Sequence, residues 1–323
     1  MRKICIINCA SIGDTLLATP LYRAIKKHHP QCKIVSVLSY AGYELLEGNP
    51  YIDIIKRYKK GDSFAPIIKA MWQSDAALIL DGHYRSALMA FIAFVHKRIG
   101  PGRDFINIHT SGQELNLFEV QRYMDVLKHV GIEDEDLTLM RPLPNPEEKH
   151  HITELIDDLR KRANKIVTIS PYSLSTLKDW EPEKYTRLID RLHENDCEAI
   201  LIGGTSDMSK SKKDFNNAVD LVGKINLRES SEVIAQADLH VCGCTSMLHV
   251  ASSVNTPSVA IYGPTSPVQW APRHNCTVIT HNLPCSPCYK KDVHVCDNNR
   301  CIKDITVDEV WEAIANRLNL SVD

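Results

Sequence analysis

The chemistry that this chain could perform begins near its start, where Ser11-Ile12-Gly13-Asp14 follows an apolar run. Glycine allows the backbone to turn tightly at such a point. A carboxylate there could accept a proton from an attacking hydroxyl group, so Asp14 is a candidate general base. The same residue could instead be the N-cap of the next helix, a position that aspartate fills well. No G-x-G-x-x-G fingerprint is present at this turn, which argues against a dehydrogenase.

Two turns in the second half of the chain could bind phosphate. The first runs from Ser170 to Tyr185 and contains Lys178, and a lysine near helix N-termini is well placed for an anion. The second reads Cys242-Gly243-Cys244-Thr245-Ser246-Met247-Leu248-His249. A helix N-terminus offers free N–H groups, and the hydroxyls of Thr245 and Ser246 would add to them. A solvated lysine, an ordinary N-cap pair and a packed His249 are the alternatives that spacing leaves open.

Four of the eleven cysteines fall within one polar segment near the C-terminus, at Cys285, Cys288, Cys296 and Cys301. Two close pairs of cysteines in a reducing compartment are the usual form of a tetrahedral thiolate metal site. The spacing therefore predicts a structural zinc or iron ion, since both metals accept four sulfurs. Reduced thiols or opportunistic disulfides are the alternative. No catalytic role is expected for a metal whose four positions are all filled by protein.

A basic run occupies the first half of the chain, with Lys56, Arg57, Lys59 and Lys60 around a tyrosine. Four charges in five residues could bind an anionic headgroup or contact a membrane surface. A solvated loop would have the same composition, and the sequence does not decide between the two.

Composition limits the function classes. The net charge of −2 argues against a general nucleic-acid binder, and 44% apolar residues allow sizeable cores. The N-terminal apolar run is short and lacks a small-residue cleavage site, so a signal peptide is not expected. No uncharged apolar stretch is long enough to span a membrane. With scattered cysteines and no export signal, the chain is expected in the cytoplasm.

Strand and helix patterns alternate along the chain. Continuous apolar runs such as Lys3–Cys9 and Ser258–Tyr262 are typical of strands buried on both faces. Helical spacing is found at Asp14–His28 and Glu114–Val130, among others. Three prolines between residues 140 and 146 predict a linker. We therefore expect two α/β domains, 1–145 and 146–323, each a doubly wound parallel sheet, with ligands beyond the carboxyl ends of the strands.

Taken together, these segments resemble glycosyltransferase family 9, the ADP-heptose-dependent heptosyltransferases. No single motif is decisive, but the segments follow the family's order over nearly the whole chain. They are Ile12-Gly13-Asp14-Thr15-Leu16-Leu17 with Thr19-Pro20, Lys178-Asp179-Trp180-Glu181-Pro182-Glu183, Leu201-Ile202-Gly203-Gly204, Thr245 to Ala251, Thr256-Pro257, and Tyr262 to Pro267.

The resemblance implies a GT-B fold, with two Rossmann-like domains facing across a cleft. The acceptor is expected in the N-terminal domain and the nucleotide sugar in the C-terminal domain, with inversion and without a catalytic metal. It gives Asp14 the role of base. It places Ser173, Lys178, Thr245 and Ser246 near the donor, with His249 on the same helix. It also implies that the cysteines could hold iron, as in some related protein heptosyltransferases.

One departure from the family is Cys244-Thr245-Ser246, where Asp-Ser-Gly or Asp-Thr-Gly is usual. The family aspartate is expected to hydrogen-bond the donor sugar, and a thiol is a weak donor and acceptor. The expected function is transfer of a heptose from ADP-heptose to a lipopolysaccharide core or other anionic glycolipid or glycan, with peripheral contact with the inner membrane. A different nucleotide sugar, a protein acceptor, or a binding or sensing protein that has lost turnover are the alternatives.

Overall fold

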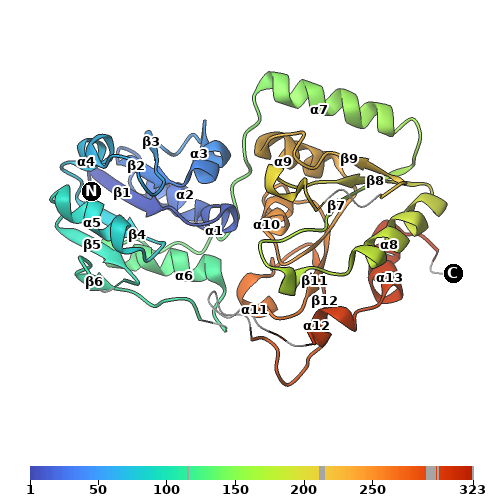
Figure 1. Cartoon of the computed structure of the whole chain (residues 1–323). Coiled ribbons are helices and arrows are strands. Elements are labelled where there is room, and N and C mark those ends of the chain that lie inside the picture. The colour runs from blue at the N-terminus through green and yellow to red at the C-terminus, as the bar shows by residue number, and fades with distance from the viewer. Residues whose placement is uncertain (103, 115, 211–214, 289–295, 297, 322–323) are drawn as a thin grey trace. The chain divides into compact units, whose positions relative to one another are not determined.

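The computed structural model describes residues 1–102, 104–114, 116–210, 215–288, 296 and 298–321. It divides into two compact units, Met1–Leu143 and Pro144–Asp323. Each unit contains a six-stranded parallel sheet with helices on both faces (Figure 1). None of the helices in the described part has the length and apolar character needed to cross a bilayer.

The sheet of the first unit has the strand order β3-β2-β1-β4-β5-β6. Its central strands bury both faces, so their sequences are continuous apolar runs rather than alternating ones. The strands are β1 (Lys3–Asn8), β2 (Lys33–Leu38), β3 (Ile54–Arg57), β4 (Ala76–Ile79), β5 (Lys97–Gly100) and β6 (Ile108–His109).

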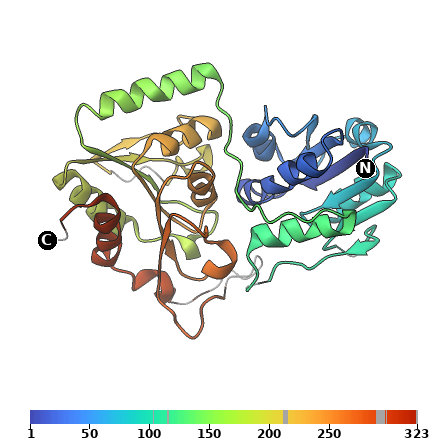
Figure 2. The ribbon, with the colours of Figure 1, turned by 180° about the vertical axis from the view of Figure 1, so that it is seen from behind.

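Helices α4 and α5 of the first unit pack on one face of the sheet, where their apolar residues meet Cys5, Ile7, Val35 and Val37. The opposite face carries α2 and α6, which are seen from behind in Figure 2. The helices of this unit are α1 (Ile12–Leu17), α2 (Thr19–His28), α3 (Tyr40–Leu46), α4 (Ala65–Met71), α5 (Tyr84–Ile92), α6 (Glu119–Asp125) and the 3-10 helix η1 (Val126–Val130).

Two helices expected as continuous are interrupted. The predicted helix Asp14–His28 is divided into α1 and α2 at Ala18, because Pro20 in the first turn of α2 cannot donate to a preceding carbonyl. The predicted helix Glu114–Val130 starts only at Glu119 and narrows to η1 before Gly131, whose φ of 77° ends it.

The sheet of the second unit has the order β12-β11-β10-β7-β8-β9, again all parallel. The strands are β7 (Lys165–Ser170), β8 (Cys197–Leu201), β9 (Ala218–Asp220), β10 (Leu239–Gly243), β11 (Ser258–Tyr262) and β12 (Cys276–Thr280). The remaining elements are α7 (Pro146–Leu159), η2 (Thr176–Lys178), α8 (Pro182–Glu194), η3 (Thr205–Asp207), α9 (Leu227–Gln236), α10 (Ser246–Ser253), α11 (Pro267–Trp270), α12 (Arg300–Lys303) and α13 (Val307–Leu318).

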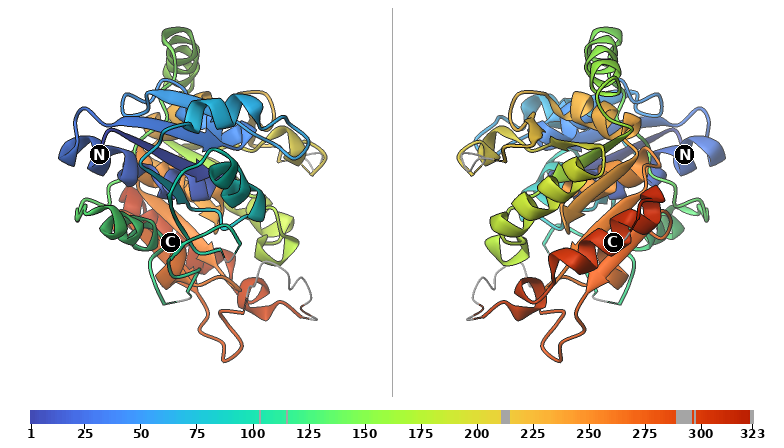
Figure 3. Two further views of the ribbon diagram at one scale, coloured as in Figure 1. Left: turned by 90° about the vertical axis from the view of Figure 1, so that its left-hand side faces the viewer. Right: turned by 90° about the vertical axis from the view of Figure 1, so that its right-hand side faces the viewer.

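The largest core of the second unit forms where α8 and α13 cover one face of the sheet (Figure 3, right). Trp180 and Trp311 are both buried there, and the Trp180 indole N–H donates to the carbonyl of Ile305 at 3.0 Å. The proline-rich segment predicted as a linker ends in a helix, since Asn145 and Glu148 form a capping box around Pro146 at the start of α7. The prediction of two Rossmann-like α/β domains is confirmed.

Candidate active site

The first unit has its topological switch point between β1 and β4, where the chain order reverses. Loops after these two strands therefore diverge to opposite faces of the sheet, and ligands of such sheets bind at this point beyond its carboxyl edge. The turn after β1 carries Ser11 and leads into α1 with Asp14 in its first turn, and the loop after β4 carries Asp81 and His83. The Cys9 backbone N–H donates to Asp81 Oδ2 at 2.9 Å, which ties the two loops together.

Asp14 is held at this edge by three hydrogen bonds. Its Oδ2 accepts from the Ser11 hydroxyl at 2.8 Å and from the Ser11 backbone N–H at 3.3 Å. Its Oδ1 accepts from the Tyr123 hydroxyl at 3.2 Å. The N-cap of α1 is Ser11, and Asp14 is its capping-box partner in the first turn, so the interpretation of Asp14 as the N-cap is wrong in position. The carboxylate keeps a fixed orientation while its side chain stays partly exposed.

Beneath Asp14 lies a buried polar group that sequence reasoning missed. Tyr123 is almost fully buried, and burial together with the neighbouring Asp14 charge raises its pKa well above the usual value. The Arg122 guanidinium lies 4.4 Å from the Tyr123 ring centroid, and its Nε donates to Glu119 Oε1 at 3.0 Å. The charges on Arg122 and Glu119 compensate each other inside the protein, which fixes the ring that donates to Asp14.

Asp81 lies on the β4 side of the switch point. Its side chain is fully buried, and its Oδ2 also accepts from the Ser86 hydroxyl at 2.7 Å. His83 Nδ1 lies 3.6 Å from the same carboxylate, and the imidazole is itself exposed. Only the Asp-Gly strand end at this point is visible in the sequence, and it gives no signal for the histidine.

The basic run lies at the carboxyl end of an edge strand rather than wholly in a loop. Lys56 and Arg57 end β3, and Lys59 and Lys60 follow it on the surface. The Arg57 guanidinium lies 4.8 Å from the Tyr40 ring centroid, and Lys59 Nζ lies 4.9 Å from the same centroid. Two cations thus contact one aromatic ring at the same edge of the sheet as Asp14.

The second unit has its switch point between β7 and β10. The loop after β7 carries Lys178, and Thr245 is the N-cap residue of α10 after β10, without a side-chain capping bond. The two loops meet because Lys178 Nζ donates to the Cys244 carbonyl at 3.3 Å. Lys178 and the first turn of α10 are therefore adjacent, and Ser246 begins that turn. A cation beside a helix N-terminus is a suitable place for a phosphate.

Two buried hydroxyls at this carboxyl edge escaped the sequence analysis. Ser170 ends β7, and Thr265 lies in the loop after β11. Both residues are more than nine-tenths buried, and neither hydroxyl oxygen has a hydrogen-bond partner among the described residues. Buried hydroxyls normally have a partner, so these two are available to a ligand or to water.

The other residues expected to bind the nucleotide-sugar donor, Ser173, His249 and Cys244, have different surroundings. Ser173 is buried, and its hydroxyl donates to the Ser175 carbonyl at 2.7 Å, so it serves the loop's own turn. His249 is buried in α10, with its ring centroid 6.4 Å from that of Trp270. Cys244 belongs to a small apolar cluster with Leu248 and Tyr262. Apolar side chains surround this thiol together with the buried Tyr262 hydroxyl, whereas a carboxylate at the same position would need charged or further polar partners.

The four C-terminal cysteines lie near one loop of the second unit, after β11. The Cys288 backbone N–H donates to the Pro264 carbonyl at 2.9 Å, and a Cβ on Gly263 would lie 3.2 Å from Cys301 Sγ. Burial, and then the neighbouring Cys288, Cys296 and Cys285, raise the pKa of Cys301 to about 11. Nonetheless, no three His, Cys, Asp or Glu side chains of the described residues come together in a metal-binding arrangement.

The chain is similar in sequence to known transferases. The family model described as "Glycosyltransferase family 9 (heptosyltransferase)" matches residues 66–296. Lipooligosaccharide heptosyltransferase 2 of Haemophilus influenzae is 25% identical over 304 residues, which covers 84% of this chain and 85% of that protein.

The fold is also similar to solved structures of heptosyltransferases. The E. coli ADP-heptose lps heptosyltransferase II has a TM-score of 0.80 at 21% identity, covering 98% of both chains. E. coli heptosyltransferase WaaC, solved with ADP-2-deoxy-2-fluoro heptose, has a TM-score of 0.70 at 16% identity, covering 97% of this chain and 99% of that one. The iron-containing dodecameric glycosyltransferase TibC of enterotoxigenic E. coli has a TM-score of 0.67 at 15% identity, covering 98% and 76%.

Proposed function

Because this chain belongs to glycosyltransferase family 9, the heptosyltransferases, we propose that it transfers a heptose from ADP-heptose to a lipopolysaccharide core or a related glycan. The chain is a glycosyltransferase with the two-domain GT-B fold of its relatives. The observation that carries the finer proposal is the fixed carboxylate of Asp14, hydrogen-bonded on both oxygens at the carboxyl edge of the first sheet.

In the proposed reaction Asp14 accepts the proton of the acceptor hydroxyl as its oxygen attacks the anomeric carbon of the donor sugar. The bond from that carbon to the diphosphate oxygen breaks, and ADP leaves with the electron pair. Attack from the face opposite the leaving group inverts the anomeric configuration. Ser11 and Tyr123 hold the carboxylate in one orientation, and fixed groups of this kind contribute through positioning rather than through new bonds.

We propose that the diphosphate binds at Lys178 and the first turn of α10, with Thr245, Ser246 and the hydroxyls of Ser170 and Thr265 nearby. The helix N–H groups and the lysine supply positive charge where the leaving group develops negative charge. Isothermal titration should show ADP binding that weakens in Lys178→Ala. Lys161→Ala removes an exposed lysine of the same unit and serves as the control. Tight UDP binding with no ADP binding would contradict the assignment.

The acceptor is proposed to bind the first unit near Lys56, Arg57, Lys59 and Lys60. Their position beside Tyr40, at the Asp14 edge, favours an anionic glycolipid or glycan. Neutralising the four should raise the apparent acceptor KM and flatten its salt dependence, with the donor KM unchanged. An unchanged acceptor KM would show that the basic run is a solvated surface segment that does not bind the acceptor.

A second candidate function is supported by Cys244. Its place in an apolar cluster, where the family aspartate is expected, favours a donor sugar with fewer hydrogen-bonding groups at this point, or a protein that binds the donor without turnover. His249 and Ser173 would then shape the pocket by packing. A thermal-shift screen of nucleotide sugars separates these cases, because a ligand of the folded state raises the melting temperature.

A structural zinc or iron ion at Cys285, Cys288, Cys296 and Cys301 is proposed on the chemistry of four neighbouring thiols. The Asn299 backbone N–H donates to Cys296 Sγ at 3.3 Å, a bond that also stabilises a thiolate ligand. These residues would cross-link the segment when a metal is bound. Elemental analysis of protein never exposed to chelator should find roughly one metal per chain. Absence of metal together with four freely titrating thiols would refute the site.

The cytoplasmic location of the protein stays a prediction.

A further inference from the structure

The first unit carries a cluster of exposed aromatic and aliphatic side chains that the proposed reaction does not use. Trp72 follows α4 and is 49% exposed, and Phe94 follows α5 and is 71% exposed. Tyr84, Phe91 and Ile92 of α5 are also exposed. We call these five residues the aromatic patch. Contiguous exposed apolar surface of this kind usually marks an interaction site.

Ring contacts join the aromatic side chains into two groups, which a backbone hydrogen bond between Phe94 and Phe91 links. The Trp72 and Phe94 rings lie 5.5 Å apart, edge to face. Phe105 bridges the other end, with its ring centroid 5.4 Å from Tyr84 and 4.9 Å from Phe91. The Phe94 backbone N–H donates to the Phe91 carbonyl, so the turn after α5 holds both rings in place. The rings are therefore fixed on the surface rather than placed there by a loose loop.

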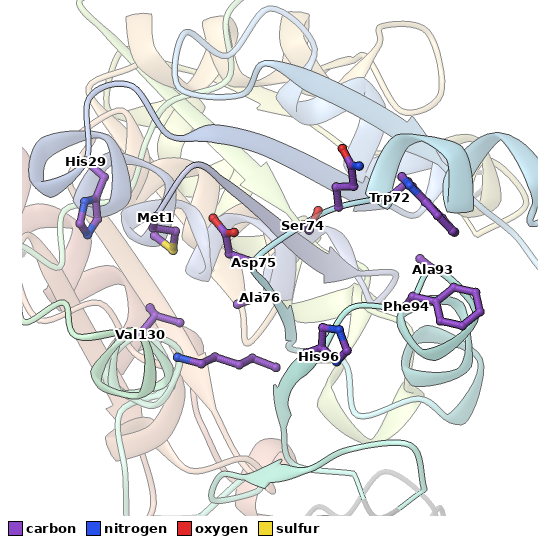
Figure 4. Close-up of a pocket in the computed structure, with 12 residues that line it drawn as sticks. Met1, His29, Trp72, Ser74, Asp75, Ala76, Ala93, Phe94, His96 and Val130 are labelled. Atoms are coloured by element: carbon purple, nitrogen blue, oxygen red, sulfur yellow. The ribbon is translucent and has the colours of Figure 1, made fainter.

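A hollow of about 700 Å³ adjoins this patch at the amino ends of the strands. Figure 4 shows Trp72 and Phe94 side by side at one end of the hollow, with His96 below them and His29 at the far end. Ser74, on the floor of the hollow, has a buried hydroxyl without a partner among the described residues. The hollow is thus lined by aromatic and imidazole groups, together with the charged side chains of Asp75 and Lys97.

Positive charges outnumber exposed negative charges around the aromatic patch. Residues 64–98 contain four basic residues and two acidic ones, of which Asp81 has a buried side chain and the exposed Asp75 accepts from the backbone N–H groups of Arg2 and Lys3. Asp104 beside Phe105 is the other exposed carboxylate near the patch. Lys69, Arg85 and Lys97 are exposed, and none forms an ion pair with a residue that the structure describes.

A fourth positive charge also lacks a carboxylate partner. The Arg98 guanidinium lies 5.4 Å from the Phe91 ring centroid and donates to backbone carbonyls, including those of Val95 and Phe105. A partner of this face must therefore supply negative charge along the edges and accept aromatic rings in the middle.

We propose that the aromatic patch docks this protein onto an anionic phospholipid bilayer. Phenylalanine and tryptophan enter the boundary between headgroups and acyl chains, and flanking lysines and arginines contact lipid phosphates. A second copy of the chain fits less well. In a two-fold interface the same patch meets itself, so the exposed Lys69, Arg85 and Lys97 of both copies would outnumber the exposed carboxylates of Asp75 and Asp104.

The placement suits an enzyme that acts on a lipid-linked acceptor, although bilayer binding does not depend on the proposed function. Tyr84 directly follows His83 at the Asp14 edge, and α5 runs from that edge to Phe94 at the opposite edge of the sheet. With this helix against the membrane, the strands lie along the bilayer, and the carboxyl edge that carries Asp14 faces parallel to its surface.

The test is sedimentation of the full chain with phosphatidylcholine vesicles, with and without phosphatidylglycerol. Binding should require the anionic lipid and weaken with salt. Trp72→Ser combined with Phe94→Ser should lower the partition coefficient by about tenfold or more. Replacing Lys69, Arg85 and Lys97 together by glutamine should lower the partition coefficient by about a hundredfold. Leu174→Ser, which removes a 91% exposed apolar side chain of the other unit, is the matched control and should bind normally.

Three results would overturn the proposal. Wild-type protein that ignores anionic vesicles would do so. Equal binding by the wild type and both patch variants, with loss only when Lys56, Lys59 and Lys60 are neutralised, would assign the contact to the basic run instead. Concentration-dependent self-association that Phe94→Ser abolishes, without vesicle binding, would assign the patch to a second copy. In the supported case Trp72 fluorescence also shifts to the blue on binding, and Trp72→Phe removes that shift.

Discussion

His240 makes the second unit sensitive to acid. It lies in the central strand β10 and is fully buried, with Nδ1 2.9 Å from the Thr168 hydroxyl. Its Nε2 has no hydrogen-bond partner among the described residues. Burial lowers the pKa of the imidazole from 6.5 to about 3. The ring therefore stays neutral in the folded protein at pH values where the unfolded chain is protonated.

The linkage between protonation and folding gives the size of the stability that the second unit loses at low pH. The stability conferred by neutral His240 is fully present above the unfolded pKa of 6.5 and is lost as the pH falls toward about 3. Within this window the slope approaches about 1.4 kcal/mol per pH unit, since one proton distinguishes the two states. At pH 5 the second unit should have lost about 2 kcal/mol relative to pH 8 through this group alone.

The assay is urea unfolding at several pH values in a Trp72→Phe background, where the three remaining tryptophans all belong to the second unit. His240→Leu changes the absolute stability, but the informative quantity is the pH slope, which should flatten by about one proton. His150→Gln, which alters a histidine 74% exposed on α7, is the control and should keep the wild-type slope. Parallel curves for wild type and His240→Leu would refute the reasoning.

Two further predictions follow from the contacts of the first unit. Tyr123→Phe keeps the ring over Arg122 but removes the hydroxyl 3.2 Å from Asp14 Oδ1, so turnover should fall by roughly tenfold at an unchanged acceptor KM; a normal turnover would show that Tyr123 does not position the base. Gly100→Ala places a Cβ 2.3 Å from the Ile79 carbonyl oxygen, which is backbone and cannot move aside. It should destabilise the first unit by about 1–3 kcal/mol or more in urea unfolding, whereas Gly112→Ala, with open space around it, should not.

The central strands of both sheets could be predicted because they bury both faces. β1 and β11 are continuous apolar runs that the sequence analysis finds nearly to the residue. The edge strands β3, β6 and β9 were missed, since their residues are half-buried or exposed and each strand includes polar residues. Edge strands depend on pairing with a neighbour, and a local pattern does not record that pairing.

In the candidate site, too, local sequence predicts some residues and misses those that depend on packing between distant segments. Asp14 follows from a glycine turn after a strand, but its partner Tyr123 lies 109 residues later in the chain. No local spacing links the two, and only the packing of α6 beside α1 brings the hydroxyl to the carboxylate. The buried Glu119 and Arg122 were missed for a related reason, because charged residues in a helix usually face solvent.

The central claim is that Asp14 serves as the base in heptose transfer from ADP-heptose. The direct measurement is ADP release from ADP-heptose with heptose-deficient lipopolysaccharide as acceptor, comparing wild type with Asp14→Asn. Asn keeps an oxygen for the Ser11 capping bond, so the variant should remain folded while turnover falls by about 10²-fold or more. ADP release by the wild type, with a matching gain of one heptose on the acceptor, is the predicted result. A folded Asp14→Asn enzyme with undiminished transfer would contradict the account.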